Sequence, residues 1–150
     1  MEYFDQGLNE KYIPYVVEPA VGVERLFLAF MAEACVEEPI GEDDSRLVAR
    51  LHPALAPFKV AILPLSKQLS EKAQSVYALC AKHFNTDYDE AGSIGKRYRR
   101  SDAIGTPFCV TIDFDSLEDN QVTIRERDTM QQIRLPLDQL VAYVQERIDF

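Results

Sequence analysis

With 150 residues and a formal net charge of -9, the chain has room for one domain, or for one small domain and part of another. Apolar residues make up 47% of the sequence and charged residues 27%, which is typical of a globular protein with a buried core. No apolar run reaches the ~18 residues that a membrane span needs, and the acidic balance argues against non-specific coating of nucleic acid.

The cysteines and histidines indicate a reducing compartment and no metal centre. Cys35, Cys80 and Cys109 are odd in number and form no Cys-x-x-Cys pair, which favours reduced thiols over a disulfide framework or a zinc site. His52 and His83 have no ligand at metal spacing, so they are interpreted as structural residues. Because the N-terminus also lacks the basic and apolar regions of a signal peptide, we predict a cytoplasmic location.

The first predicted elements are a strand and a helix. β-branched and aromatic residues over 12–18 favour a strand that ends before Pro19, and Gly22 then permits a tight turn. A helix is predicted over 23–35, with apolar residues on nearly all sides. Such a helix is expected to contact protein on several sides, which a chain of this length does not obviously provide.

An acidic segment follows the helix. Residues 37–45 are interrupted by Pro39 and Gly41 and show no period, which predicts a linker or a surface loop. A short amphipathic turn is predicted over 46–51, so we assign residues 37–53 as a connection rather than as part of a core.

From residue 54 the pattern alternates between strands and helices. It predicts a three-layer α/β domain with a mixed five-stranded sheet flanked by helices. The first three strands are joined by helical crossovers and should be parallel, and the fourth should run against the third as a hairpin. The predicted strands are 58–65, 86–90, 108–114, 122–127 and 132–135, and the predicted helices are 70–84, 95–104 and 136–148.

The strongest functional signal is a group of four cations within five residues, bracketed by glycines. Clustering like charges in an acidic chain favours an anionic partner, and RNA phosphate fits an α/β domain of this kind. The alternative is a basic helix face that is solvated or paired with acids such as Asp102. Tyr98 within the cluster is either a stacking platform for a base or an anchor of the helix to the sheet. The predicted RNA contacts are Lys96, Arg97, Arg99, Arg100, Thr123, Arg125 and Arg127.

The sequence contains no complete active site. The motifs GxGxxG, GxxxxGK[ST] and GxSxG are absent. Cys109 lies on a predicted strand, where core packing explains it better than nucleophilic catalysis. The carboxylates Asp113, Asp115, Glu118 and Asp119 could bind a cation, but a solvated hairpin turn explains them more simply.

Several segments, in their order along the chain, resemble one family. The run from Glu18 to Leu26, with its Gly-x-x-Arg, resembles motif three of the class II aminoacyl-tRNA synthetases. The runs 55–65, 92–115 and 117–132 resemble the C-terminal anticodon-binding domain of glycyl-tRNA synthetases of the homodimeric type. The segment G-K-R-Y-R-R, followed by I-G-T-P, is more similar to that family than to the histidyl, threonyl and prolyl families, which share the fold.

The resemblance implies roles for residues before position 54. Arg25 and Gly22 would belong to an ATP site, and Glu18 would help to recognise the glycine ammonium. The parent enzyme would use ATP with Mg to attach glycine to tRNA-Gly through glycyl adenylate, as a homodimer formed by its catalytic domain. Ala20 stands where the family commonly has serine, which is a departure at the amino-acid contact.

The same resemblance implies a division of the chain. Residues 1–53 would be the C-terminal remnant of a class II catalytic domain plus a linker, and residues 54–150 an anticodon-binding domain. Since motifs one and two are absent, we expect the fragment itself to be inactive and to hold no cofactor. Its expected partner is tRNA-Gly rather than DNA or a membrane. The alternative function is a non-catalytic accessory domain of the same fold without tRNA specificity, and a small self-contained enzyme is the least supported.

Overall fold

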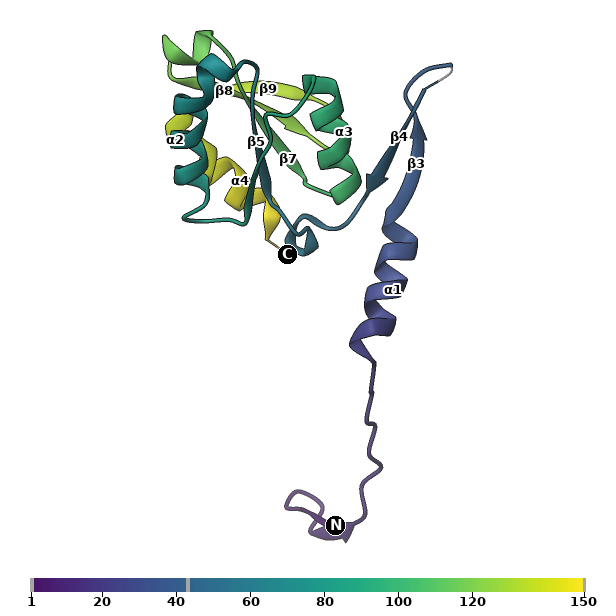
Figure 1. Cartoon of the computed structure of the whole chain (residues 1–150). Helices are drawn as coiled ribbons and strands as arrows, with labels where there is room; N and C mark the ends of the chain where they lie inside the picture. The colour runs from purple at the N-terminus through teal and green to yellow at the C-terminus, as the bar shows by residue number, and fades with distance from the viewer. Residues whose placement is uncertain (1, 43, 150) are drawn as a thin grey trace.

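The computed structural model describes residues 2–42 and 44–149. An α/β body carries most of the elements, and helix α1 and the N-terminal segment project from it (Figure 1). In chain order the strands and α-helices are β1 (Tyr3–Asp5), β2 (Glu10–Tyr12), α1 (Val23–Ala34), β3 (Cys35–Pro39), β4 (Ser45–Ala49), β5 (Val60–Pro64), α2 (Ser70–Cys80), β6 (Thr86–Tyr88), α3 (Ile94–Ile104), β7 (Phe108–Ile112), β8 (Gln121–Glu126), β9 (Gln132–Pro136) and α4 (Leu140–Ile148). Short 3-10 helices are η1 (Pro53–Leu55), η2 (Lys67–Leu69), η3 (Asp115–Leu117) and η4 (Leu137–Gln139).

The body is built on a five-stranded mixed sheet in the order β6-β5-β7-β8-β9. Strand β5 pairs in parallel with β6 and with β7, whereas β8 runs antiparallel to both β7 and β9. The predicted number of strands, the parallel first three strands and the antiparallel hairpin partner are therefore confirmed. The carboxyl ends of β5, β6 and β7 meet at one edge of the sheet, which we call the carboxyl edge.

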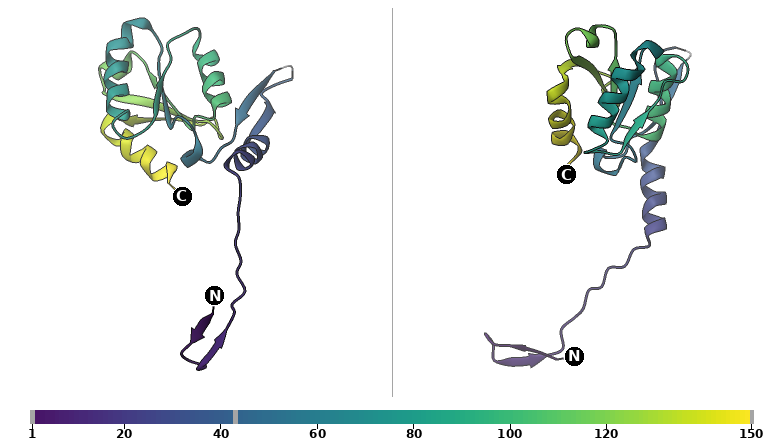
Figure 2. Two further views of the ribbon diagram at one scale, coloured as in Figure 1. Left: turned by 60° about the horizontal axis from the view of Figure 1, so that its bottom comes forward. Right: turned by 60° about the vertical axis from the view of Figure 1, so that its left-hand side comes forward.

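Helices cover both faces of this sheet, as predicted (Figures 1 and 2). Apolar side chains of α2 and α4 pack with those of β5, β7 and β8 in the larger core. On the other face, Ala61, Leu63 and Cys109 pack against Ile94 and Tyr98 of α3. Strand β5 is buried at every position because it is central and covered on both sides. The result is a three-layer α/β fold.

The N-terminal segment differs from the prediction. Strand β2 ends at Tyr12 and pairs only with β1, so the strand predicted over 12–18 is wrong. Its apolar residues, such as Tyr15 and Val17, are exposed, since no neighbouring strand lies within reach to form a ladder with this segment. Helix α1 is present as predicted, but Ala34 is its only buried residue in the described chain. None of the helices among residues 2–42 and 44–149 is both long and apolar enough to cross a membrane.

A β-hairpin replaces the predicted linker. Strand β3 follows α1 directly and pairs with β4, from Cys35 opposite Ala49 to Pro39 opposite Ser45. Strand β4 was not predicted because two of its residues reverse the usual pattern of burial: the charged Arg46 is buried, whereas the apolar Leu47 is exposed. The hairpin packs on the end of α3, so residues 35–49 belong physically to the α/β body.

One glycine shows how closely the hairpin approaches α3. Gly105 ends α3 in the left-handed conformation with φ of 89°, and a Cβ there would lie 2.8 Å from the carbonyl oxygen of Ala49. We expect Gly105→Ala to lower the free energy of unfolding by about 2 kcal/mol, measured by urea denaturation. The matched control is Gly95→Ala within α3, where a Cβ meets nothing within 4 Å and should stabilise by about 0.5–1 kcal/mol. Equal effects of the two changes would contradict this account.

Candidate nucleic-acid interface

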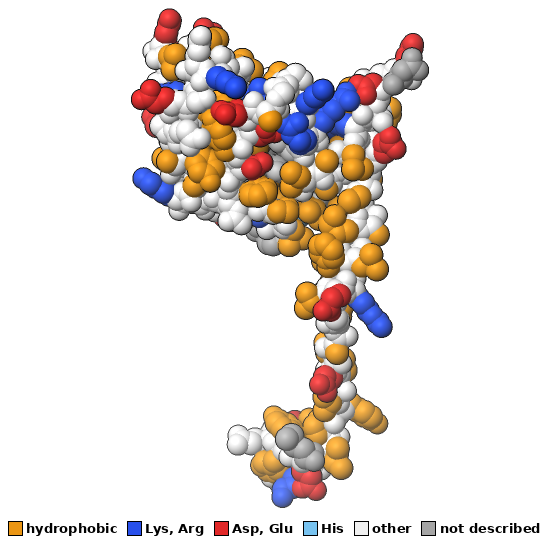
Figure 3. Space-filling view, viewed as in Figure 1, with side chains coloured by type: hydrophobic (Ala, Val, Ile, Leu, Met, Phe, Trp, Pro, Cys, Tyr) orange, Lys and Arg blue, Asp and Glu red, His pale blue; other side chains and the backbone are white. Residues whose placement is uncertain are grey.

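Helix α3 presents its cations at the carboxyl edge of the sheet. It begins directly after β6 and the turn at Gly92, whose φ of 78° favours glycine. Ile94 and Tyr98 face the sheet, and Lys96, Arg99 and Arg100 are exposed on the other side of the helix. We call these three residues the basic face. Lys and Arg side chains gather over α3 in the space-filling view (Figure 3).

The three cations of the basic face are engaged to different degrees. Lys96 makes no ion pair within the described part of the chain. Arg99 pairs with Asp44 of the β3–β4 hairpin. Arg100 donates from Nε to Asp89 at 2.9 Å and from Nη2 to the carbonyl of Ala91 at 2.6 Å. Each side chain remains exposed, so an incoming anion can reach it.

The fourth cation of the cluster, Arg97, has a structural position. Its guanidinium is buried and donates to the carbonyl oxygens of Pro64 at 2.5 Å and Gly92 at 2.9 Å. These bonds tie the end of β5 to the turn before α3. Arg97 was predicted to contact RNA, but its burial does not fit that role. Position 97 on the helix faces the sheet, whereas positions 96, 99 and 100 face away from it.

Arg125 and Arg127 are also buried rather than presented to a ligand. Arg125 donates both Nη atoms to the carboxylate of Asp102, at 2.8 and 3.0 Å, and Arg46 donates to the same carboxylate at 2.9 Å. We call Arg46, Asp102 and Arg125 the Asp102 network. Arg127 donates to the carbonyls of Gly105 and Leu51, both at 2.8 Å.

These contacts correct the expected exposure of both arginines. The alternation of residues on β8 cannot show that Arg125 lies against a buried carboxylate. Asp102 pairs with Arg125 and Arg46 rather than with the basic face. The half-buried Thr123 accepts a hydrogen bond from Arg134 at 3.4 Å, so it alone of the three β8-region candidates remains partly accessible.

Tyr98 is the anchor of α3 to the sheet, one of its two proposed roles. Its hydroxyl lies 2.7 Å from Oγ1 of Thr111, and the Arg125 guanidinium lies 4.7 Å from its ring centre. Burial raises the pKa of Tyr98, so the phenol stays protonated at neutral pH. The ring is therefore already packed and does not serve as a platform for a base.

The carboxyl edge holds further exposed groups that the sequence analysis did not select. Phe114 lies two residues after the end of β7 and is 53% exposed, and Leu117 in the turn that begins there is 56% exposed. Arg134 of β9 reaches across this edge and donates to Asp113 at 2.7 Å and to Asp119 at 2.9 Å. The signal that would have found Phe114 is its position at the carboxyl end of a predicted strand, where α/β sheets bind ligands. Leu117 in η3 and Arg134 within β9 carry no such signal.

The Asp113–Arg134 pair should make stability depend on acid pH. Hydrogen bonds from Arg134 are the main cause that lowers the pKa of Asp113 to about 2. A lowered folded-state pKa gives stability that is present above the unfolded value near 4 and is lost as the pH falls toward 2. We expect Arg134→Gln to remove about 1 kcal/mol of this pH-dependent stability, since the pair is partly exposed.

Urea denaturation at pH 5 and pH 2.5 measures this difference. Arg147→Gln is the control, because within the described residues the carboxylate partner of Arg147 is the exposed Glu146, and the change should leave the pH dependence unchanged. An identical pH dependence in wild type and Arg134→Gln would contradict the assignment.

The remaining candidate sites show no reactive arrangement. Burial raises the pKa of the Cys109 thiol to about 12, which fits core packing and not a nucleophile. Within residues 2–42 and 44–149, no three His, Cys, Asp or Glu side chains are arranged to hold a metal ion. Asp113 and Asp119 are instead neutralised by Arg134.

The residues implied for ATP do not form a site in this chain. Glu18, Gly22 and Arg25 are all exposed, and Gly22 serves as the N-cap of α1. No ion pair joins Glu18 or Arg25 to another described residue. A nucleotide site needs walls on several sides, and these residues stand on a projecting helix and the extended segment before it (Figure 1). By themselves, these residues do not form a site that fits ATP.

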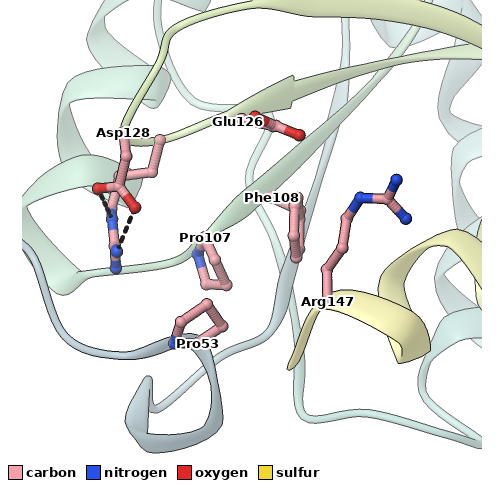
Figure 4. Close-up of a pocket in the computed structure, with 7 residues that line it drawn as sticks. Pro53, Pro107, Phe108, Glu126, Asp128 and Arg147 are labelled. Carbon is pink, nitrogen blue, oxygen red and sulfur yellow. Dashed lines mark hydrogen bonds and ion pairs between the residues drawn. The ribbon is translucent and has the colours of Figure 1, made fainter. Parts of the chain in front are cut away.

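A pocket of about 260 Å³ lies at the opposite, amino end of the strands (Figure 4). Pro53, Pro107 and Phe108 form its apolar side. Its charged groups already have partners, since Arg127 pairs with Asp128 and Glu126 accepts from Tyr143 at 2.8 Å. These contacts leave little unmet bonding capacity for a ligand, so the basic face and the carboxyl edge are the stronger candidate interface.

The fold and this edge define an α/β domain of the kind carried by aminoacyl-tRNA synthetases, as the solved structures show. The chain is similar to the RNA binding domain of threonyl-tRNA synthetase from Cryptosporidium parvum, with 32% identity and a TM-score of 0.60 over 65% of this chain and 25% of that one. It also shares the fold of histidyl-tRNA synthetase from Nostoc sp., at 20% identity and a TM-score of 0.59 over 62% of this chain and 23% of that one.

The chain belongs to the anticodon binding domain family, which residues 59–147 match. Over its whole length it is similar to glycine–tRNA ligases. The identity is 59% over 150 residues for the ligase of Clostridium tetani, 58% over 154 for that of Clostridium perfringens and 57% over 150 for that of Ruminiclostridium cellulolyticum. The chain spans about a third of these relatives, at 32%, 33% and 32% of their lengths.

Proposed function

We propose that this chain is the tRNA anticodon-binding portion of a glycine–tRNA ligase, with tRNA-Gly as its partner. The observation that carries the proposal is the identity to glycine–tRNA ligases along the full chain, with an exposed basic face on the domain that matches the family. Residues 54–150 are the anticodon-binding domain. Residues 1–53 are the C-terminal remnant of a catalytic domain plus a linker, and the β3–β4 hairpin of this part packs against α3 of the anticodon-binding domain.

The parent protein would attach glycine to tRNA-Gly in the cytoplasm, as a homodimer that uses ATP with Mg. These activities rest on the relatives, because the chain covers only 32% of the Clostridium tetani ligase. The groups implied for ATP are exposed here, so the activity proposed for the chain itself is RNA binding.

The basic face would hold the RNA backbone. Lys96 has no competing ion pair in the described chain, and Arg99 and Arg100 keep Nη1 unbonded to other described residues. Cations bound to phosphates fix the position of an RNA strand without reading its sequence. The contact set is therefore revised to Lys96, Arg99 and Arg100, with Thr123 at the edge, whereas Arg97, Arg125 and Arg127 support the fold.

The carboxyl edge would read the bases. Phe114 offers an exposed ring for stacking, and Asp115 and Glu118 beside it are exposed carboxylates. Carboxylates repel phosphate but accept a hydrogen bond from the amino group of cytosine. Glycine codons begin with two guanines, so the glycine anticodon presents cytosines. Strands β6 and β7 are two strand spacings apart, about 10 Å, so one short single strand can contact both regions.

The test is a titration with tRNA-Gly and with a tRNA that differs only in its anticodon, at two salt concentrations. We expect preference for the glycine anticodon, and a loss of roughly 5- to 100-fold in affinity in Phe114→Ala. Leu117→Ala is the matched control, because it removes a similarly exposed apolar side chain from the same turn without removing a ring.

Two results would go against the proposal. Equal and steeply salt-dependent binding of both tRNAs would leave only a phosphate-binding surface. Absence of binding to either tRNA at low salt would favour the accessory interaction domain.

A further inference from the structure

The β3–β4 hairpin places acidic residues beside the basic face. No Lys or Arg occurs between Arg25 and Arg46, and the segment 37–44 carries five carboxylates, of which Asp43 lies outside the described residues. At the tip of the hairpin, Arg99 pairs with Asp44, and the side chains are 50% and 53% exposed. The amide of Ile40 donates to the carbonyl of Asp44 at 2.8 Å and closes this loop. The tip therefore presents a carboxylate to a cation of the proposed RNA interface.

The hairpin is held in two different ways. Next to the tip, strand β4 is fixed by Arg46, which is buried and donates to Asp102 and to the carbonyl of Arg127, both at 2.9 Å. Among the described residues of the loop, the tip is held by one ion pair, the exposed Asp44–Arg99 pair. Exposed pairs contribute little to stability, whereas buried pairs are costly to break. The tip contact can thus open while the hairpin stays docked.

The carboxylate partner of Arg100 is held more firmly than that of Arg99. This partner, Asp89, also accepts a hydrogen bond from the amide of Ala91 at 2.8 Å, and the Asp89 side chain is only 16% exposed. Asp89 is therefore part of the turn before α3 and stays in place. Asp44 is the one carboxylate of these two that an incoming anion can displace.

We propose that Asp44 competes with an RNA phosphate for Arg99 and gives up its contact with Nη2 when the phosphate takes both arms of the guanidinium. A guanidinium binds carboxylate and phosphate through the same planar fork, so the two anions compete for Arg99. This inference rests on the proposed function, because it names a competitor within the same interface. The consequence is selectivity among anionic ligands. An anion that contacts Arg99 alone gains little binding free energy, because it must first displace Asp44. An RNA strand that also contacts Lys96 binds more tightly and outcompetes the internal carboxylate.

The experiment measures binding of an RNA stem–loop with the glycine anticodon to wild type, Asp44→Asn and Glu42→Gln. Glu42 is the matched control, since it is an exposed carboxylate of the same loop with no ion pair to another described residue. Both changes remove one negative charge, but only the first frees Arg99. We expect Asp44→Asn to bind about two- to fivefold more tightly than wild type, and Glu42→Gln to differ much less.

The same pair is then measured in an Arg99→Gln background. There Asp44→Asn should lose its advantage over Glu42→Gln, since the competition requires the guanidinium. Equal gains from the two loop changes, or a gain from Asp44→Asn that persists without Arg99, would overturn the inference. Neither result touches the proposed function, which fails separately if wild type shows no anticodon preference. If no variant binds the stem–loop, both are overturned.

Discussion

Replacing Asp102 by asparagine is expected to lower the free energy of unfolding by about 3–5 kcal/mol. Asp102 is 1% exposed, and its carboxylate accepts hydrogen bonds from Arg125 and Arg46. Asparagine keeps the size of the side chain but removes the charge, which leaves the buried guanidinium of Arg125 without its counter-ion and leaves Arg46 with Glu38 alone. Urea denaturation followed by circular dichroism measures the effect.

The control for this change is Asp115→Asn, which removes an exposed carboxylate with no ion pair to a described residue and should alter stability by less than about 0.5 kcal/mol. A change of less than 1 kcal/mol in Asp102→Asn would mean that Arg125 finds another partner, contrary to the structure.

Arg46→Gln separates the two parts that the Asp102 network joins. Arg46 lies on β4, whereas Asp102 and Arg125 lie on α3 and β8. Its loss should release the hairpin while Arg125 and Asp102 stay paired. Hydrogen exchange is therefore expected to rise in the amides of β3 and β4 before it rises in the five-stranded sheet. Uniform exchange in both would show that the hairpin and the domain unfold as one unit.

The sequence predicted the sheet well because its strands obey simple rules. Strand β5 is apolar throughout and ends at a proline, and β7 and β8 alternate as a hairpin should, so the order of elements and the parallel pairing followed. The hairpin β3–β4 was missed because one of the buried residues of β4 is Arg46, whose partner Asp102 is 56 positions away. No local pattern contains such a contact.

The candidate site was predicted only in part, because local sequence patterns do not contain contacts between residues that are far apart in the chain. Charge clustering located α3 correctly, but only helical phase separates Lys96, Arg99 and Arg100 from the inward-facing Arg97. Arg125 and Arg127 looked like RNA contacts because an arginine on a strand is usually exposed. Whether each one meets a phosphate or an internal carbonyl depends on tertiary packing, as the bond from Arg127 to Leu51 shows.

Neutralising the basic face should have the largest effect on RNA binding. We expect the triple variant Lys96→Gln, Arg99→Gln and Arg100→Gln to weaken binding of the anticodon stem–loop about 100-fold at low salt, since each lost phosphate contact costs about 1 kcal/mol or more. With three fewer phosphate contacts on a single strand, the slope of log affinity against log salt should fall by about 2. Stability should change little, because all three side chains are exposed.

A second triple variant tests whether position matters more than net charge. Lys11→Gln, Lys82→Gln and Arg147→Gln remove the same charge from exposed sites away from α3, on the N-terminal segment, after α2 and on α4. If affinity depended only on the overall field of this acidic chain, both triple variants would weaken binding equally. If the basic face grips phosphates directly, only the first will lose affinity and salt slope together. Both variants keep Arg97, Arg125 and Arg127. If the first variant loses RNA binding, these three buried arginines are therefore not sufficient for it, which agrees with their role in supporting the fold.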